Sequence, residues 1–278
     1  MTNHVAGKSI VITGGGGGFG KLVAEKAAAL GASVTLGDID GAAAEAVAAA
    51  ITASGGKAQA VATDVTELAQ CHKLVGAAVG AHGRIDVMIN NAGIMPLAFF
   101  SDHEAAYPAW QRCIDINIKG VLNGMIAAYD PMIAQGRGQV INISSIYGNF
   151  PVVGAAIYGA TKAAVNVMGE SLRMESRGKI KVTTIKPTGV PATGLSASVI
   201  NPAASVGILG HNAPEFMAMV ADMQAGTFPA ERLDPHNIDY ASLAPEHIAD
   251  AIVYAINQPW GVSLGEITVR AAGDHFIL

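Results

Sequence analysis

Short runs of β-branched residues alternate with alanine-rich runs along this chain of 278 residues. Alternation of this kind is typical of βαβ units built around a parallel sheet. Runs such as IVIT, VMIN and VINI are almost continuously apolar, which indicates strands covered by helices on both faces. The pattern predicts strands over 9–13, 33–39, 58–65, 85–90, 139–144, 181–186 and 266–270, and helices over 19–30, 42–54, 67–82, 110–134, 155–176, 215–224 and 245–257.

The composition excludes several classes of protein. Hydrophobic residues make up 51% of the chain and charged residues 14%, which is too apolar for a disordered protein. The net charge is -5 and Lys and Arg form no cluster, so neither nucleic acid nor a membrane is an expected partner. Cys71 and Cys113 lack metal-binding spacing, so we expect reduced structural thiols, no metal site and a cytoplasmic location. No linker divides residues 1–278, which are predicted to form one domain.

A glycine-rich loop, Thr13-Gly-Gly-Gly-Gly-Gly-Phe-Gly20, follows the first predicted strand and opens the first predicted helix. A dinucleotide pyrophosphate needs close backbone approach, free N–H groups and a helix N-terminus directed at it. Glycine permits that approach because it has no Cβ atom. The order strand, loop, helix distinguishes a phosphate-binding loop from a flexible turn. Several spacings fit the pure glycine run, and Gly14, Gly18 and Gly20 is one of them.

Acidic residues follow the second and third predicted strands. Asp38 lies 18 residues after Gly20, where a carboxylate can bind the adenosine ribose and repel a 2′-phosphate. Asp40 is an equivalent candidate for beginning the next helix. No Lys or Arg lies within Gly14–Gly20 or closely after Asp38, so the sequence favours NAD over NADP. Asp64 could reach the adenine, or it could cap the following helix.

Tyr158 and Lys162 stand four residues apart in a predicted helix, which places both on one face. A tyrosine hydroxyl titrates near ~10, but a neighbouring ammonium lowers that pKa. Such a tyrosine can take a proton from an alcohol or give one to a carbonyl. Ser145 could bond to the same oxygen, and Ser144 is equivalent by chemistry alone. The spacing is also compatible with a helix-surface pair that has no function.

Together these elements resemble the classical short-chain dehydrogenases/reductases over essentially the whole chain. The family's serine lies thirteen residues before its tyrosine, which selects Ser145 over Ser144. The matching residues are Thr13, Gly14, Gly18 and Gly20 for the motif Thr-Gly-x-x-x-Gly-x-Gly, Asn90, Asn91, Ala92 and Gly93 for Asn-Asn-Ala-Gly, Asn117 for the helix asparagine, and Ser145, Tyr158 and Lys162 for the catalytic residues.

The resemblance implies a Rossmann-like, doubly wound α/β fold with a seven-stranded parallel sheet between two helix layers. It implies Tyr158 as the acid/base, Lys162 as the group that holds the nicotinamide ribose and lowers the tyrosine pKa, and Ser145 as the group that orients the substrate oxygen. Asn117 would position a water that relays the proton outward. Many relatives are tetramers, so a homotetramer is expected. The cofactor contacts expected for NAD are Thr13, Gly14, Gly18, Phe19, Gly20, Asp38, Asp64, Val65, Asn91, Ala92, Gly93, Tyr158, Lys162, Pro187, Gly189, Val190 and Thr193.

One departure from the family follows the sixth predicted strand. The family reads Pro-Gly there, with a threonine five residues past the proline, whereas Pro187 is followed here by Thr188 and Gly189. Thr193 lies six residues past Pro187, and Ala192 occupies the usual place. We therefore expect a reshaped loop around the nicotinamide carboxamide.

The irregular segment at about 188–240 is where the family places its substrate lid, and long irregular loops are often functional. Methionines and other apolar residues in it suit an adaptable lid, although about half of them are expected to pack on the body. No arginine is placed to clamp a carboxylate, so an apolar or aromatic substrate is expected. His211 is expected at the surface. The expected substrate contacts are Met95, Ser145, Tyr147, Phe150 and Tyr158.

These features predict an oxidoreductase that transfers a hydride between NAD(H) and a secondary alcohol or ketone, a small-molecule substrate. The alternative is an NAD(H)-binding redox sensor or scaffold without significant turnover. An intact Tyr158 argues against it, because a pure sensor needs no acid/base group. Dehydration or epimerisation ranks last, since such relatives are usually longer and have a different glycine spacing.

Overall fold

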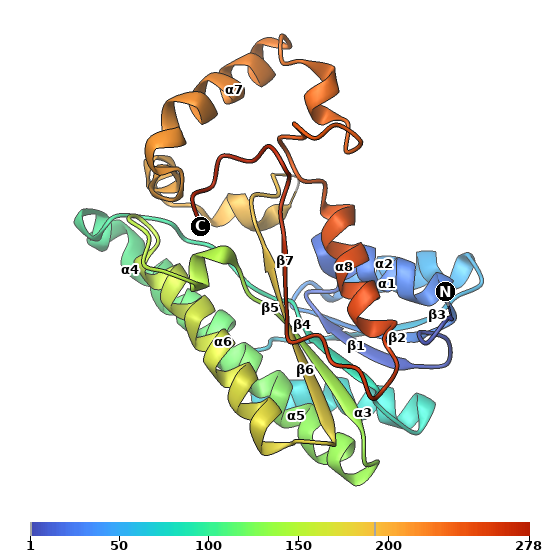
Figure 1. Ribbon diagram of the computed structural model, residues 1–278. Coiled ribbons are helices and arrows are strands. Elements are labelled where there is room, and N and C mark those ends of the chain that lie inside the picture. The colour runs from blue at the N-terminus through green and yellow to red at the C-terminus, as the bar shows by residue number, and fades with distance from the viewer. Residues whose placement is uncertain (1, 192) are drawn as a thin grey trace.

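The computed structural model describes residues 2–191 and 193–278, and it contains one parallel sheet. The strand order is β3-β2-β1-β4-β5-β6-β7, and each neighbouring pair is parallel (Figure 1). The predicted doubly wound α/β fold with seven strands is confirmed. The strands are β1 (Ser9–Thr13), β2 (Ser33–Asp38), β3 (Lys57–Ala62), β4 (Val87–Asn90), β5 (Gly138–Ile143), β6 (Ile180–Pro187) and β7 (Glu266–Val269).

Two layers of helices bury the two faces of this sheet. Alanines and β-branched residues of α1, α2 and α8 share one hydrophobic core with the sheet, and residues of α3, α5 and α6 share another. Small alanine side chains let these helices pack close to the strands. The helices of the first layer are α1 (Gly18–Ala29), α2 (Gly41–Ala53) and α8 (Pro245–Ile256), and those of the second are α3 (Leu68–His82), α5 (Val121–Ala134) and α6 (Ala156–Glu175), with α4 (His103–Ile114) against α6.

The helix predicted over 110–134 begins earlier and is not regular. It starts at His103, and a π-helical stretch over Asp115–Gly120 separates α4 from α5. Such wider turns are rare and often occur at functional sites. This one carries Asn117, which is fully buried. The apolar pattern predicts where the helix runs but contains no signal for the change of hydrogen bonding within it.

Strand order changes direction between β1 and β4, so the connections after these two strands diverge to opposite faces. Open α/β sheets bind ligands in the crevice that this divergence leaves at the carboxyl ends of the strands. The segment predicted as a lid contains α7 (Ala213–Ala225), which lies away from both helix layers at the top of Figure 1. Short 3-10 turns make up much of the rest, at Gly194–Ser198, Pro202–Ile208, Gly210–Asn212 and Ala230–Leu233.

Both cysteines are buried and free, and burial raises the pKa of each thiol to about 11. Across residues 2–191 and 193–278, no three His, Cys, Asp or Glu side chains are grouped as metal ligands. None of the described helices combines the length and the apolar character that crossing a bilayer requires.

Candidate active site

The glycine loop between β1 and α1 has a backbone that side chains would not tolerate. Gly14 and Gly18 adopt positive φ angles of 66° and 50°. A Cβ atom at Gly20 would lie 2.1 Å from the carbonyl oxygen of Gly14. Glycine is therefore required at all three positions, which is the spacing of the family motif.

Residues just after β4 hold this loop in place through hydrogen bonds. The Thr13 hydroxyl oxygen accepts the N–H groups of Asn91 at 3.0 Å and Ala92 at 3.2 Å. The Asn91 side-chain amide donates to the carbonyl oxygens of Thr13 at 2.9 Å and Gly14 at 3.0 Å. Thr13 is buried, so it shapes the loop from behind, whereas Asn91 also reaches the cavity wall.

Asp38 and Asp40, which the sequence left as alternatives, have different roles. Asp40 caps α2, because its carboxylate accepts the N–H of Ala43 at 3.0 Å. Asp38 turns toward the glycine loop, where its Oδ2 accepts the N–H of Gly16 at 2.9 Å. The carboxylate of Asp38 therefore lies beside the loop, at the edge of the cavity.

Asp64 and Val65 line a second cavity of about 590 Å³ that adjoins the glycine loop. The Asp64 carboxylate accepts the backbone N–H of Thr66 at 2.9 Å and its hydroxyl at 2.8 Å, which forms a turn ahead of α3. This cavity and the main one share four lining residues, namely Gly14, Asp38, Ala92 and Gly93. The two cavities are therefore continuous along the carboxyl ends of the strands. Residues of this wall that the sequence did not predict include Ile39, Arg112 and Ile116.

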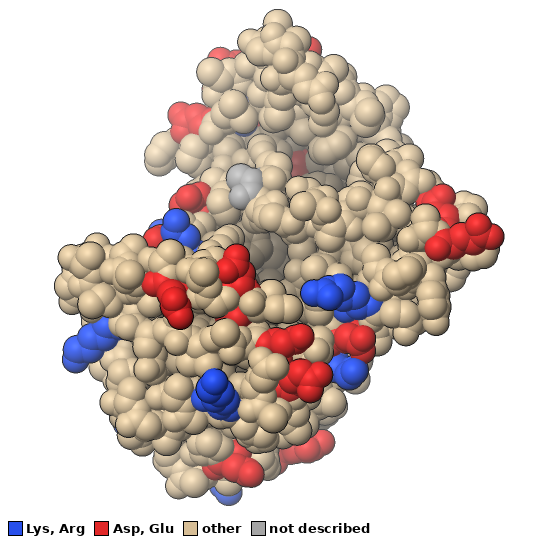
Figure 2. All heavy atoms as spheres, turned by 180° about the vertical axis from the view of Figure 1, so that it is seen from behind, with Lys and Arg blue, Asp and Glu red and all other residues tan. Residues whose placement is uncertain are grey.

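The main cavity has a volume of about 610 Å³ and lies at the carboxyl ends of the strands. Figure 2 shows this face hollowed between the part that contains α7 and the body, with mostly uncharged atoms around the hollow. Few of its lining residues are charged, so the wall is largely apolar. The predicted site residues that line it are Gly14, Gly18, Phe19, Asp38, Asn91, Ala92, Gly93, Met95, Ser145, Tyr147, Tyr158, Lys162, Pro187, Gly189, Val190 and Thr193.

Tyr158 and Lys162 extend from α6 into the wall of this cavity, and both are buried. The Lys162 ammonium lies 5.7 Å from the centre of the Tyr158 ring and donates a hydrogen bond to the carbonyl oxygen of Ile143 at 2.8 Å. Burial raises the pKa of Tyr158 well above its usual value, and the Ser145 hydroxyl opposes only part of that effect. Burial lowers the pKa of Lys162 to about 8. In this structure burial outweighs the expected lowering of the tyrosine pKa.

The two neighbouring serines differ in how much of their hydroxyl is free. Ser144 is committed elsewhere, because its hydroxyl donates to Asn166 at 2.7 Å and lies 3.2 Å from the carbonyl oxygen of Lys162. Ser145 accepts one long hydrogen bond, from the N–H of Tyr147 at 3.3 Å. The geometry therefore leaves Ser145 available to a ligand beside Tyr158.

Asn117 connects the π-helical stretch to the loop after β4. Its amide nitrogen donates to the carbonyl oxygen of Ile94 at 2.9 Å and to the Thr161 hydroxyl at 3.1 Å, and its oxygen accepts the N–H of Ile94 at 3.0 Å. A Cβ atom on Gly93 would lie 3.2 Å from the Asn117 oxygen. The Asn117 side chain thus fixes the loop after β4 relative to α6. Its contact on α6, Thr161, lies one helical turn after Tyr158.

The loop after β6 differs from the family pattern and is held by the end of the chain. The Thr188 N–H donates to the carbonyl oxygen of Val269 at 3.1 Å. A Cβ atom on Gly189 would lie 2.3 Å from the ring of Phe276, so glycine is required where that ring packs. The Thr193 hydroxyl lies 3.3 Å from the carbonyl oxygen of Val190. Ala192 lies outside the described residues.

Comparison with known proteins identifies this arrangement. The family model described as short chain dehydrogenase matches residues 8–203, which include the glycine loop, Asn117, Ser145, Tyr158 and Lys162. The chain belongs to the short-chain dehydrogenase family. The predicted family membership is thereby confirmed, and the chain is an oxidoreductase of this family.

Similar proteins include dehydrogenases and uncharacterised oxidoreductases. The 2,5-dichloro-2,5-cyclohexadiene-1,4-diol dehydrogenase LinX of Sphingobium indicum is 38% identical over 72% of this chain and 79% of its own. The uncharacterised oxidoreductase Lmo0432 of Listeria monocytogenes is 34% identical over 95% and 96%. Among solved structures, a metagenomic short-chain oxidoreductase in complex with NADP has a TM-score of 0.71 and 26% identity, and covers 96% of this chain and 98% of its own. An alcohol dehydrogenase from the archaeon Thermococcus sibiricus, complexed with 5-hydroxy-NADP, has a TM-score of 0.76 at 20% identity over 96% and 97%, and shares the fold.

One expected substrate contact of this short-chain dehydrogenase lies outside the cavity. The Phe150 side chain is 63% exposed and does not line the wall. Gly148 explains its position, because a Cβ atom there would lie 2.8 Å from the backbone of Lys162. The chain packs tightly on α6 at that point, and the next two residues, Asn149 and Phe150, are exposed. Met95 and Tyr147, in contrast, line the cavity, and the Tyr147 ring packs edge-to-face on Tyr158 at 5.5 Å.

The lid and the C-terminal segment contribute wall residues that short-range motifs did not predict. His275 and Phe276 line the main cavity although they lie 113 or more residues after Lys162. His211 is exposed, as expected for a surface residue. Apolar lid residues that the sequence suggested, and that the wall contains, are Leu209, Phe216, Met219 and Met223, joined by Val220.

Proposed function

We propose that this oxidoreductase transfers a hydride between NAD(H) and a secondary alcohol or ketone, with Tyr158 as the acid/base. The observation that carries the proposal is a single cavity whose wall contains the glycine loop, Asp38, Ser145, Tyr158 and Lys162 together. A nucleotide and a small substrate bound there would meet the two hydroxyls and the ammonium at one place. Residues 1–278 are proposed to act as one domain with a lid at about 188–240, in a cytoplasmic homotetramer.

The cavity is suited to a nicotinamide dinucleotide. Positions 14, 18 and 20 leave backbone N–H groups at the start of α1 uncovered by side chains, and a helix N-terminus favours phosphate. Thr13 and Asn91 would hold this loop in place, and Asp38 would bind the adenosine ribose. The Asp38 carboxylate also repels a 2′-phosphate, which supports NAD over NADP.

The nicotinamide, when bound, would supply or accept the hydride, and the chain supplies position and protons. Ser145 would hold the substrate oxygen beside the Tyr158 hydroxyl. Lys162 would bind the nicotinamide ribose while its ammonium stays near the Tyr158 ring. Asn117 is a positioning residue, because its amide already holds Ile94 and Thr161. The relay water predicted for it stays a prediction.

The protonation of Tyr158 gives the reaction a pH preference. Because burial raises its pKa, the hydroxyl is protonated at neutral pH and can donate to a carbonyl oxygen. Oxidation needs the opposite form, so its rate should rise with pH through the neutral and alkaline range. Reduction should fall as the hydroxyl loses its proton.

The wall supports an uncharged substrate. Met95, Leu209, Phe216 and Met219 present apolar side chains, and we propose an apolar or aromatic alcohol or ketone. The relative LinX is named for a chlorinated cyclohexadiene diol, a carbocyclic secondary alcohol, which agrees with this class.

Steady-state assays of secondary alcohols and ketones with NAD(H) and NADP(H) test the proposal. In Tyr158→Phe, we expect turnover of an accepted substrate to fall by about 10²–10⁴-fold, while NADH binding stays within a few-fold of wild type. Turnover that survives near the wild-type rate would refute the mechanism. NADH binding with no turnover of any alcohol or ketone would favour the sensor instead.

The cofactor preference has its own test in Asp38→Ser. Removing the carboxylate removes a repulsion worth roughly 1–4 kcal/mol at close range, so kcat/KM with NADP should rise about tenfold or more relative to NAD. Asp40→Ser is the matched control, because Asp40 caps α2 and should leave the ratio unchanged. A wild-type preference for NADP would contradict the assignment.

A further inference from the structure

The C-terminal segment forms part of the cavity wall and is fixed there by several contacts. Phe276 packs on Gly189 of the loop after β6. The Ile277 N–H donates to the carbonyl oxygen of Ile208 at 3.1 Å. The Arg270 guanidinium donates to the carbonyl oxygen of Phe276 at 2.8 Å and pairs with Asp274 at 2.7 Å. The segment is thus held between the lid and the proposed nicotinamide loop.

His275 is the ionisable side chain that this segment adds to the wall. It is 5% exposed, and its ring packs edge-to-face on Phe216 of α7 at 5.9 Å. Its backbone carbonyl accepts the Asn212 amide at 3.1 Å, which fixes its position. The other ionisable residues that line the main cavity are Asp38 beside the glycine loop, Tyr158 and Lys162 of the proposed catalytic group, and Tyr147, which packs on Tyr158.

One ring nitrogen of His275 lies near a polar group and the other has no hydrogen-bond partner among the described residues. Its Nε2 lies 3.7 Å from the carboxylate of Glu215. Its Nδ1 is buried and makes no hydrogen bond within residues 2–191 and 193–278. An unpaired buried polar atom costs about 1–3 kcal/mol, and such atoms are uncommon in folded proteins. A site that binds a polar ligand group is one reason for a protein to retain one.

The neighbour of Nε2 decides which chemistry Nδ1 offers. A carboxylate near Nε2 favours the proton on that nitrogen, and in a neutral imidazole the other nitrogen is then an acceptor. Nδ1 would therefore complement a hydroxyl donor. The wall near His275 is apolar, because Phe216 packs on the His275 ring and Phe276 packs on Phe216. Such a hydroxyl would therefore be the polar end of an otherwise apolar molecule.

We propose that His275 Nδ1 accepts a hydrogen bond from a second hydroxyl of the substrate, remote from the carbon that exchanges the hydride. The substrate class is then a compact diol, with one hydroxyl at Ser145 and Tyr158 and the other at His275. This inference rests on the proposed function and narrows it. A cavity of about 610 Å³ that also holds part of a dinucleotide leaves room for a small ring and not for a large one.

Matched probes test the inference, namely cyclohexanol, cyclohexane-1,3-diol and cyclohexane-1,4-diol with NAD. We expect the wild type to have a kcat/KM for at least one diol that is tenfold or more above that for cyclohexanol. In His275→Phe, which keeps a ring without nitrogen, this advantage should disappear through KM, with cyclohexanol within twofold of wild type. His275→Asn places an amide oxygen where Nδ1 was and should restore most of it. The exposed His236→Phe in the lid is the control and should change nothing.

No diol advantage in the wild type, or one that persists in His275→Phe, would overturn the inference while the proposed function stands. If neither these probes nor the wider panel of alcohols and ketones is turned over, the proposed function fails, and a second measurement still decides the role of His275. In ¹⁵N-histidine NMR of the NADH complex, the Nδ1 signal of His275 is assigned by its absence from the spectrum of His275→Asn. This signal should shift with a diol and not with cyclohexanol. A signal that responds to both, or to neither, would refute the contact.

Discussion

Two buried lysines at opposite ends of the sheet share the same lowered pKa, about 8, and each donates to a backbone carbonyl oxygen, but they differ in the cavity and the charges beside them. Lys162, at the carboxyl ends, lines the main cavity and lies near Tyr158. Lys8 precedes β1 at the other end and lines neither of the two cavities described above. It donates to the carbonyl oxygen of Ile256 at 2.6 Å, the last residue of α8.

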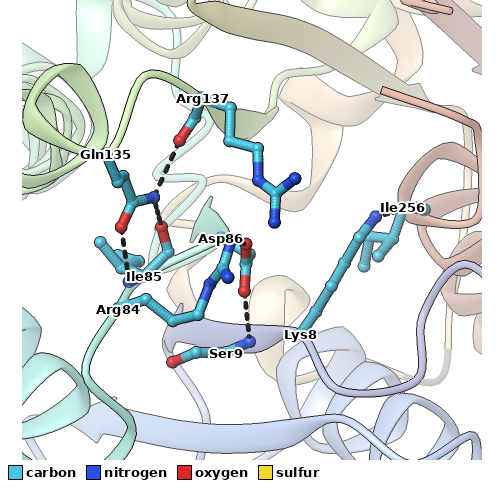
Figure 3. Close-up of polar contacts among 8 residues, drawn as sticks. All are labelled: Lys8, Ser9, Arg84, Ile85, Asp86, Gln135, Arg137 and Ile256. Carbon is cyan, nitrogen blue, oxygen red and sulfur yellow. Dashed lines mark hydrogen bonds and ion pairs between the residues drawn. The ribbon is translucent and has the colours of Figure 1, made fainter. Parts of the chain in front are cut away.

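The causes of the two shifts separate the lysines further. Burial lowers the pKa of Lys162, and no neighbouring cation contributes. Burial also dominates at Lys8, but Lys181 and Arg137 add repulsion that Asp86 offsets in part. Figure 3 shows Lys8 extended to Ile256 and the Arg137 guanidinium directed into the same space, with Asp86 facing Ser9. A perturbed pKa therefore identifies a functional lysine only together with a cavity and a reacting partner.

The comparison predicts its largest effect in activity. Lys162→Met removes an ammonium from the proposed nicotinamide ribose site and from the Tyr158 ring, so kcat/KM should fall by on the order of 10³-fold. Lys8→Met removes an equally buried ammonium and should leave kcat/KM within about twofold, because it touches no proposed site residue. Steady-state kinetics on one accepted substrate measure both. Equal losses in the two variants would mean that the Lys162 effect is structural.

A second prediction concerns stability at the other end of the sheet. Lys8 has a folded pKa of about 8 against 10.5 when unfolded, so between these values the folded state binds fewer protons. The free energy of unfolding should therefore rise with pH across this window, by on the order of 2 kcal/mol relative to Lys8→Met. Urea denaturation of both proteins at pH 7, 8, 9 and 10 measures the difference. Parallel curves would show that Lys8 titrates normally.

The same contrast shows what local patterns can and cannot predict. The alternation of strands and helices, the glycine loop and the pair Tyr158–Lys162 are short-range signals. The structure brings the loop and the pair together at the carboxyl ends of the strands. Asp38 and Asp40 are the same residue type and lie two positions apart, so the sequence does not distinguish their roles. Only the fold directs Asp38 to the glycine loop and Asp40 to the N–H of Ala43. His275 has no signal of this kind, because it reaches the cavity through the packing of Phe276 on Gly189.

The prediction that Phe150 contacts the substrate was wrong for a related reason. Nearness in sequence to Ser145 does not decide whether a side chain points into the cavity. Gly148, two residues before Phe150, packs closely on α6, and Phe150 itself is exposed. Lys8 was equally unpredictable, since its neighbours Lys181, Asp86 and Trp260 lie far apart in the sequence. Contacts that close long loops are decided by the whole fold and not by a window of residues.

The smallest expected effect concerns Trp260, which lies among three cations. The ring centre is 4.8 Å from the Lys8 ammonium, 5.4 Å from that of Lys181 and 5.0 Å from the Arg137 guanidinium. An aromatic face attracts a cation by about 0.5–1 kcal/mol at partly exposed sites, so Trp260→Leu should lower the free energy of unfolding by roughly 1–2 kcal/mol at pH 7.

Protonation separates this attraction from packing. Lys8 is largely neutral at pH 10, so its attraction to the ring is lost there in the wild type as well, and the cost of Trp260→Leu should shrink. Trp260→Phe keeps an aromatic face and should lose less at pH 7 than the leucine variant. A loss that is equal at both pH values would mean that the indole only fills space, and that the cations at this end of the sheet are held by carbonyl oxygens such as those of Ile256 and Val262 alone.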